Sequence, residues 1–272
     1  MPKAFSVASW NVEHFKNVLS RVDDVVALLA NLKPDVFSLY EVEGKDVFGE
    51  LVNRMPGYQF HITEGPQVQE ILVGVRSGLT AFFTQKIEFR SGASAMRPGS
   101  LLTVTTAGES YPILFLHLAS GPDPRGWGLR DDMLERALDF RKTLQKGAAD
   151  PAKPVNYLFL GDLNTMGMEY LFKAHNILAD VELKKIEAIA KKQKMRTLTK
   201  NKPHTWSNGS LSRLKPSNLD HVVAAAHLQF KQFNGADVRV LGWPEEPTPA
   251  AQDEWIKRFS DHGILYFEVQ RV

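Results

Sequence analysis

The stretch from residue 58 to residue 118 constrains the fold most, because it holds a succession of short apolar segments and no long helical pattern. Turn-forming pairs such as Gly65-Pro66, Ser77-Gly78 and Pro98-Gly99 separate these segments. Consecutive antiparallel strands are expected here, whereas a doubly wound parallel sheet would need a helix between most strands. The expected strands are Tyr58 to Thr63, Ile71 to Val75, Ala81 to Phe89, Leu101 to Thr105 and Ile113 to Leu118.

Outside this stretch, apolar strand patterns alternate with amphipathic helix patterns, and no repeat or linker interrupts them. Ser20 and Asp23 predict a helix start, and Pro34 predicts that this helix ends before it. Two mixed sheets packed face to face, with helices outside, account for the whole pattern as one α/β domain over residues 1–272. The other expected elements are strands over Phe5 to Trp10, Asp35 to Val42, Val155 to Leu160, Leu219 to Ala225 and Ile264 to Val269, and a helix over Leu129 to Gln145.

The amino-acid composition limits which metal ligands and nucleophiles the protein can use. The 272 residues include no cysteine, which excludes disulfides, thiolate zinc sites and a cysteine nucleophile. A metal ion would therefore be held by oxygen and nitrogen atoms. No apolar run approaches the roughly 18 residues that span a bilayer, and Met1-Pro2-Lys3 leads directly into a strand pattern. We expect no stable membrane insertion and a cytoplasmic location.

The basic residues are unevenly distributed. The net charge of +2 is too small to indicate a nucleic-acid-binding protein by itself. One region, from Lys184 to Lys202, is strongly basic and contains a single acidic residue, Glu187. It could contact the phosphates of a nucleic acid, or it could be a solvated helix face followed by a loop. Its basic residues are Lys184, Lys185, Lys191, Lys192, Lys194, Arg196, Lys200 and Lys202.

Two segments almost 100 residues apart suggest a functional site. Gly161-Asp162-Leu163-Asn164 follows one apolar strand pattern, and Ser260-Asp261-His262-Gly263 precedes another. A rigid sheet can aim side chains at its strand ends into one cleft. Carboxylate and amide oxygens suit Mg²⁺ or Mn²⁺, and a histidine beside an aspartate suits proton transfer or charge stabilisation.

Further polar residues lie at strand ends. Asn11 ends the first predicted strand and could offer its side-chain oxygen to a cation or its NH₂ to a phosphate oxygen of the substrate. Glu41 ends the second, where a buried carboxylate is costly unless it is paired or metal-bound. His117, between Leu116 and Leu118, could be a satisfied core residue or a catalyst. Asp220 could be a turn cap at a strand start. A single cleft would explain all of these positions together.

Two arginines follow His117 in a turn-rich stretch that runs from Ser120 to Gly128. Arg125 or Arg130 could bind a phosphate, because a guanidinium donates two parallel hydrogen bonds to phosphate oxygens. A surface role is the alternative for each.

Taken in order, these motifs resemble the endonuclease/exonuclease/phosphatase superfamily, which has a deoxyribonuclease I-like fold. The similarity spans nearly the whole chain. The resemblance implies a four-layer sandwich of two packed mixed β-sheets flanked by helices, and hydrolysis of phosphate esters with Mg²⁺ or Mn²⁺. The matching motifs are Trp10-Asn11, Tyr40-Glu41, His117-Leu118, Gly161-Asp162-Leu163-Asn164, Leu219-Asp220-His221 and Ser260-Asp261-His262.

The resemblance also implies roles for individual residues. Glu41 would be the principal metal ligand, with Asn11 and Asp261 nearby. Asp162 and Asn164 would orient or deprotonate water and hold the phosphate. His262, oriented by Asp220, would face the scissile phosphate. His117 would be a second catalytic histidine, and Glu70 could be its carboxylate partner.

We expect a metal-dependent phosphodiesterase, with nuclease activity on DNA or RNA as the leading interpretation. The region from Lys184 to Lys202 would then contact the nucleic acid. A small-molecule or lipid phosphohydrolase, similar to sphingomyelinases or inositol phosphatases, could use the same site. A non-catalytic binding protein with this fold is the third alternative, against which the complete acidic and histidine set argues.

Overall fold

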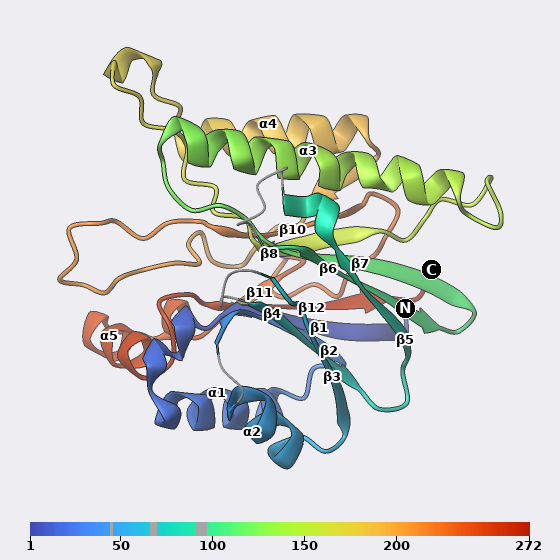
Figure 1. Ribbon diagram of the computed structural model, residues 1–272, viewed down its shortest axis with the longest axis horizontal. Helices are drawn as coiled ribbons and strands as arrows, with labels where there is room; N and C mark the ends of the chain where they lie inside the picture. The colour runs from blue at the N-terminus through green and yellow to red at the C-terminus, as the bar shows by residue number, and fades with distance from the viewer. Residues whose placement is uncertain (44–45, 66–69, 91–96) are drawn as a thin grey trace.

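The computed structural model describes residues 1–43, 46–65, 70–90 and 97–272. In these residues two six-stranded sheets pack face to face, and helices cover both outer surfaces (Figure 1). The first sheet has the order β11 (Arg239–Leu241), β12 (Ile264–Gln270), β1 (Lys3–Asn11), β2 (Val36–Val42), β4 (Glu70–Arg76) and β3 (Tyr58–Ile62). The second has the order β5 (Thr80–Lys86), β6 (Gly99–Thr106), β7 (Glu109–His117), β8 (Leu158–Asp162), β10 (Asp220–Ala225) and β9 (Met195–Thr197).

The helices form the two outer layers. Helices α1 (Leu19–Leu32) and α2 (Asp46–Arg54) lie on the first sheet, and α3 (Pro124–Lys146) and α4 (Ala179–Lys192) lie on the second (Figure 1). Helix α5 (Pro249–Arg258) lies beside one end of the first sheet (Figure 1). Short 3-10 helices occupy Glu13–Asn17, Ile87–Arg90, Lys173–His175 and Trp243–Glu245. The predicted four-layer sandwich of two mixed sheets is confirmed. No helix in the described ranges is long and apolar enough to cross a membrane.

Alternation along the strands explains why their apolar patterns are continuous. Phe115 and Leu160 belong to the core between the two sheets, whereas their neighbours Leu116 and Phe159 belong to the core beneath α3 and α4. Successive side chains point to opposite faces of a sheet, and here both faces are covered. A third core, which includes Trp10, fills the space between the first sheet and its helices. Strands buried on both faces hold the residues at their ends rigidly.

Among the described strands, each sheet contains one parallel pair, and these two pairs position the site. β1 and β2 are parallel and are joined through α1, while β7 and β8 are parallel and are joined through α3. Parallel strands end at the same edge of a sheet. The register pairs Asn11 with Tyr40, directly before Glu41, and pairs His117 with Asp162. Polar residues from four strand ends therefore meet at one edge of the sandwich.

The structure corrects several predicted boundaries. Helix α1 begins at Leu19 with no side-chain cap, so Ser20 lies inside the helix instead of starting it. Helix α3 begins at Pro124, five residues before its expected start, because the Asp123 carboxylate accepts hydrogen bonds from the backbone N–H groups of Arg125 and Gly126. Part of the stretch expected to be a turn is therefore helix.

Strand pairing between residues 58 and 118 is only partly consecutive. The β3–β4, β5–β6 and β6–β7 pairs are antiparallel, as expected. Strands β4 and β5, however, belong to different sheets, so the chain crosses between the sheets from Arg76 to Thr80. Apolar patterning does not distinguish these outcomes, because both strands can bury one face in the same inter-sheet core.

Candidate active site

A cleft of about 670 Å³ lies where the carboxyl ends of β1, β2, β7 and β8 meet. Glu41, His117, Asp162, Asn164, Asp261 and His262 are among the residues that line it. Every one of these residues was predicted as a site residue from the sequence. They come from both sheets, so the cleft exists only once the two sheets have packed.

Asn11 joins the two sheets at the base of the cleft. Its side-chain NH₂ donates to Glu41 Oε1 at 3.0 Å and to Asp162 Oδ2 at 2.9 Å. Its side-chain oxygen accepts from the backbone N–H of Glu13 at 2.9 Å. This pattern fixes the amide orientation, because the opposite one would place the oxygen against two carboxylates. Asn11 therefore turns its NH₂ toward the cluster, and not the oxygen that the predicted metal-ligand role requires.

His262 forms a buried pair with Asp220. Nδ1 of His262 lies 2.8 Å from Asp220 Oδ2, and its Nε2 lies 3.8 Å from Asp162 Oδ2. Burial alone would lower the pKa of His262, but the charges of Asp220, Asp162 and Asp261 and the hydrogen bond to Asp220 raise it well above its usual value. The ring is therefore held as an imidazolium that faces Asp162. Asp220 acts as the partner of a histidine and is not merely a turn cap.

Asp162 lies at the centre of the cluster and is 1% exposed. Burial, together with the charges of Asp220 and Glu41, raises its pKa to about 7, against the lowering effects of His262 and Asn11. A carboxylate with a pKa close to neutral pH can exchange a proton with water. Leu163 is fully buried, and the Asn164 side chain donates to Leu118 O at 3.2 Å. The Asp-Leu-Asn segment thus presents two polar side chains while one apolar side chain anchors it.

His117 lies on the other side of the cluster. Its Nε2 is 3.6 Å from both Glu41 Oε1 and Asp162 Oδ2. The Arg97 guanidinium lies against the ring, with Nε 2.9 Å from Nδ1 and Nη2 3.1 Å from Nε2. A neutral imidazole accepts at one nitrogen only, so the Nδ1 contact is the hydrogen bond and Nε2–H faces the carboxylates.

The neutral form of His117 has an electrostatic cause. Burial and the charges of Arg97, His262 and His14 lower the pKa of His117 well below its usual value. The predicted partner of this histidine, Glu70, instead accepts from Thr63 Oγ1 and from the Gly65 backbone N–H. The structure therefore corrects that expectation and pairs His117 with Arg97.

Backbone strain is concentrated at the cleft. Glu41 and Asn164 both have positive φ angles, 61° and 50°, which non-glycine residues rarely adopt. The positive φ of Glu41 takes the chain out of strand geometry, as the register shift between β2 and β4 also shows. The direction of the Glu41 side chain therefore does not follow the alternation of the preceding strand residues. The strain aims the Glu41 carboxylate into the cleft.

Gly161, in β8, allows close approach to β7 in the same sheet and to Tyr40 of β2 in the other sheet. A Cβ atom at this position would lie 1.9 Å from the Leu116 carbonyl oxygen and 2.8 Å from the Tyr40 hydroxyl. Its φ of 144° is also one that side chains disfavour. Only glycine therefore allows Asp162 to reach its place beside Glu41.

The donor set fits a hard divalent cation. Glu41, His117 and Asp162 each offer a ligand atom, and these atoms all lie within 4.8 Å of one another; Asp162, Asp220 and His262 form a second such group. Glu41 is the member with the most exposed side chain, at 17%. Two carboxylates beside one imidazole suit Mg²⁺ or Mn²⁺, and there is no thiolate to favour a softer metal.

Asp261 lines the cleft, but its carboxylate is already engaged. Oδ2 accepts from the Trp206 indole N–H at 2.7 Å, and Oδ1 lies 3.9 Å from His262 Nε2. Asp261 does not belong to either candidate metal-binding group in the described residues. Its observed contacts orient Trp206 and add negative charge near His262.

The two predicted phosphate-binding arginines lie outside the cleft lining. Arg130 is fully buried: it pairs with Glu182 at 3.1 Å and donates to the backbone oxygens of Ala119, Gly121 and Gly167. It therefore holds two loops together, and the prediction that it binds substrate is wrong. Arg125 is exposed in the first turn of α3.

Among the cleft residues that sequence reasoning missed are Arg97, Trp206 and His14. Arg97 and Trp206 line the cleft, and neither lies in a recognisable motif. His14 also lines it, with Nε2 at 2.9 Å from Glu41 Oε2 and Nδ1 bonded to Glu43. His14 lies in the short 3-10 helix over Glu13–Asn17, where Glu13, His14 and Phe15 all have positive φ, a conformation that the sequence does not predict. Its nearness to Asn11 was the one available signal.

The basic region from Lys184 to Lys202 is partly neutralised. Lys184 pairs with Asp180, Lys185 with Asp131 and Arg196 with Asp237. Lys200 points inward, to Asn218 and Asp220. Pairing and burial therefore leave a smaller basic surface than the sequence suggests.

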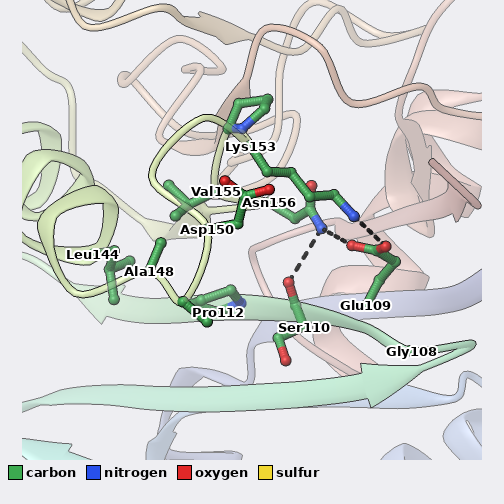
Figure 2. A pocket seen from close by; sticks show the side chains of 12 residues that line it. Gly108, Glu109, Ser110, Pro112, Leu144, Ala148, Asp150, Lys153, Val155 and Asn156 are labelled. Carbon is green, nitrogen blue, oxygen red and sulfur yellow. Dashed lines mark hydrogen bonds and ion pairs between the residues drawn. The ribbon is translucent and has the colours of Figure 1, made fainter.

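A second pocket, of about 330 Å³, lies at the opposite end of the second sheet, where β7 and β8 begin (Figure 2). Two of its polar groups are paired within the pocket: Lys153 pairs with Glu109, and the Asn156 side chain donates to Ser110 O at 3.2 Å. It has no counterpart of the carboxylate and imidazole cluster among its lining residues. The cleft beside Glu41 is therefore the candidate active site.

A two-sheet sandwich with acidic, amide and imidazole groups gathered at the ends of its parallel strands defines a hydrolytic phosphoesterase. The model of the Endonuclease/Exonuclease/phosphatase family matches residues 8–262, and the chain belongs to this family. No curated protein sequence matches it.

Solved structures share the fold at low sequence identity. Truncated TDP2 from Caenorhabditis elegans is 16% identical, with a TM-score of 0.67, over 98% of this chain and 97% of that one. D. rerio TDP2 complexed with a single-strand DNA product is 18% identical, with a TM-score of 0.68, over 98% and 99%. A mannosyl-6-phosphatase from Bacteroides thetaiotaomicron is 14% identical, with a TM-score of 0.62, over 98% and 100%.

Proposed function

We propose that the protein is a divalent-cation-dependent phosphodiesterase that cleaves nucleic acid. The observation that carries the proposal is that Glu41, Asp162 and His262 lie together: Asn11 donates to Glu41 at 3.0 Å and to Asp162 at 2.9 Å, and His262 Nε2 lies 3.8 Å from Asp162 Oδ2. These groups can surround one phosphate together. An isolated acidic patch would lack the imidazolium and the amide donor.

Each residue has a distinct proposed task. Asp162, with a pKa of about 7, accepts a proton from the attacking water. Asn164 shares the segment of Asp162 and contacts a phosphate oxygen. His262, held as an imidazolium by Asp220, stabilises the negative charge that develops on the phosphoryl oxygens. Neutral His117 donates from Nε2 to the same centre.

Glu41 and Asp162 would hold the cation, since His117 in its neutral form keeps the proton on Nε2 and accepts from Arg97 at Nδ1. Mg²⁺ or Mn²⁺ held there would supply positive charge to stabilise the phosphate oxygens and the leaving alkoxide. Asn11 then acts as a positioning residue for Glu41 and Asp162, because its two N–H groups are donated to these carboxylates.

Two features favour nucleic acid as the substrate. Trp206 and Lys215 line the cleft together, which offers a ring for stacking on a base and an ammonium for a neighbouring phosphate. Trp206 is held by its hydrogen bond to Asp261, so its ring is already oriented. TDP2, with the same fold, has been crystallised with single-strand DNA product.

A phosphatase acting on a small phosphoester is the second candidate. The fold of a mannosyl-6-phosphatase favours it, and so does Glu169, whose charge in the cleft lining would repel a polyanion. Both candidates use the same central residues and differ in what surrounds the phosphate.

Salt dependence separates the two candidates. We would measure turnover of single-stranded DNA, single-stranded RNA, a sugar phosphate and bis(p-nitrophenyl) phosphate with Mg²⁺, Mn²⁺ or a chelator, at 50 and 200 mM salt. Contacts with several phosphates predict a steep loss of oligonucleotide turnover between these salt concentrations. Turnover confined to the small esters would favour the second candidate, and no turnover of any substrate would favour a binding protein.

A further inference from the structure

Behind the catalytic pair, a partly buried lysine holds the backbone of Asp220. Nζ of Lys200 donates to the Asp220 carbonyl oxygen and to the Asn218 side-chain oxygen, and it lies 3.4 Å from His221 Nδ1. Lys200 belongs to the segment that follows β9 and does not line the cleft. Lys200 therefore contacts the backbone of Asp220 from outside the cleft.

His221 continues this network toward the other catalytic segment. Its Nε2 lies 2.9 Å from Asn218 O and 2.8 Å from Thr165 Oγ1. Thr165 Oγ1 also donates to Asn218 O at 2.8 Å, so its proton is already used. The proton on His221 must then be on Nε2, and Nδ1 is left to accept from Lys200. Burial and the charge of Lys200 lower the pKa of His221 well below its usual value, in keeping with this neutral form.

The network joins the two segments that carry the chemistry. Thr165 directly follows Asn164, and Asn218 precedes Asp220 by two residues. The backbone N–H of Asp220 is also hydrogen-bonded: it donates to Thr205 Oγ1 at 3.0 Å. Lys200 and Thr205 therefore hydrogen-bond to the backbone C=O and N–H of Asp220, respectively. These two bonds fix the Asp220 backbone and so the direction of its carboxylate.

We propose that Lys200 is a positioning residue for hydrolysis: through the Asp220 carbonyl and the His221–Thr165 contacts, it holds Asp220 in line with His262 Nδ1. It touches neither the phosphate nor the attacking water. The inference rests on the proposed phosphoesterase activity of the same site, but it is independent of which phosphoester is cleaved.

The chemistry of the position supports a role beyond packing. A lysine that turns its ammonium away from water loses hydration, and burial lowers the pKa of Lys200 to about 7. The three acceptors around Nζ offset that loss. An apolar side chain of similar length would fill the space without this cost and would leave the Asp220 carbonyl without its donor.

The test compares Lys200→Met with Lys192→Met, a matched change at an exposed lysine at the end of α4. With bis(p-nitrophenyl) phosphate, we expect Lys200→Met to lower kcat by about 10- to 100-fold, the range found when a residue that orients a catalytic group is removed. KM should change less than about twofold, and Lys192→Met should match the unsubstituted protein. Circular dichroism establishes that each variant is folded.

A second readout addresses the orientation itself. In proton NMR spectra, the His262 Nδ1–H bonded to Asp220 should exchange slowly with water, and Asp220→Asn assigns its resonance. We expect Lys200→Met to broaden or shift this resonance and Lys192→Met to leave it unchanged. Thr165→Val removes the far end of the network without removing a charge, and it should lower kcat in the same direction by severalfold. This variant carries the test if Lys200→Met does not fold.

Two results would overturn the proposal. One is a folded Lys200→Met protein with kcat within twofold of the unsubstituted value. The other is a loss of kcat with an unchanged His262 resonance, which would mean that Lys200 acts elsewhere. If the unsubstituted protein hydrolyses no phosphoester, the proposed function fails, while the NMR comparison still tests whether Lys200 orients the pair.

Discussion

Asp220 Oδ2 lies 2.8 Å from Nδ1 of His262, and both side chains are buried, at 2% and 5% exposure. The two residues are 42 positions apart: Asp220 begins β10 of the second sheet, and His262 lies two residues before β12 of the first. This contact sets both the direction and the charge of the imidazole. It also connects the two sheets at the point where the cleft opens.

Asp220→Asn should lower kcat for a model phosphodiester by about 100-fold or more, because the amide neither fixes the imidazolium nor balances its charge. KM should change little, since Asp220 does not line the cleft. Steady-state kinetics would be compared with those of Asp139→Asn, a change at an exposed position on α3. Equal activity of the two variants would contradict the assigned role of Asp220.

Glu41→Gln should raise the concentration of Mg²⁺ or Mn²⁺ needed for half-maximal activity by about tenfold or more, because a neutral amide replaces a charged ligand of similar shape. Isothermal titration with each metal gives a second readout that does not depend on turnover. Metal affinity equal to that of the unsubstituted protein would remove Glu41 from the metal site.

Arg130→Met should lower the free energy of unfolding by about 3 to 5 kcal/mol, because it leaves the buried Glu182 carboxylate without its partner. Adding Glu182→Leu should recover most of this loss, since the unpaired charge is then gone. Urea denaturation measures both effects. Lys184→Met, at the exposed pair with Asp180, should change the free energy by only about 0.5 kcal/mol.

Gly161→Ala should destabilise the fold by about 3 kcal/mol or more, because the new Cβ would overlap the Leu116 carbonyl and the residue would keep an unfavourable φ. Gly49→Ala is the matched control. It lies in α2 with no atom within 4 Å of the added Cβ, and it should stabilise by up to about 1 kcal/mol. Thermal unfolding that ranks the two variants in the opposite order would contradict this account.

Asp35 should make the stability depend on pH in the acid range. Burial opposes its ionisation, but hydrogen bonds from Lys3 and from the Ser6 backbone and hydroxyl lower its pKa below the usual value. The folded state therefore binds a proton less readily than the unfolded state. The stabilisation is present above the unfolded pKa of about 3.9 and is lost as pH falls through the folded value.

Asp35→Asn provides the measurement of this effect. The difference in unfolding free energy between the unsubstituted protein and the variant should be about 1 to 3 kcal/mol at pH 7, the range for hydrogen bonds to a charged group. It should shrink as pH is lowered below 4. A difference that stays constant from pH 7 to pH 2.5 would contradict the assigned role.

Much of the fold could be predicted from apolar periodicity. Continuous apolar strands such as Phe5 to Trp10 indicate burial on both faces, and the absence of a helical pattern between residues 58 and 118 excludes a doubly wound sheet. Polar residues at strand ends identified His117, Asp162 and His262, because such positions are costly inside a protein without a partner. Local sequence carries both kinds of information.

Other features were decided by packing alone. Arg130 and Arg125 look alike in the sequence, yet one is buried against Glu182 and the other is exposed, because α3 begins at Pro124 and turns only Arg130 inward. Whether β5 joins the sheet of β4 depends on contacts across the whole sandwich. In the sequence, Lys200 does not differ from the other basic residues between Lys184 and Lys202. Only its hydrogen bond to the Asp220 carbonyl distinguishes it.

Periodicity and side-chain chemistry are local properties, so the layered architecture and the types of residue available for catalysis could be predicted from the amino-acid sequence. Which of those residues meet depends on how the chain packs. Glu41, Asp162 and His262 come from distant parts of the chain, and their separations depend on how two sheets pack and on the strained turns that aim each side chain.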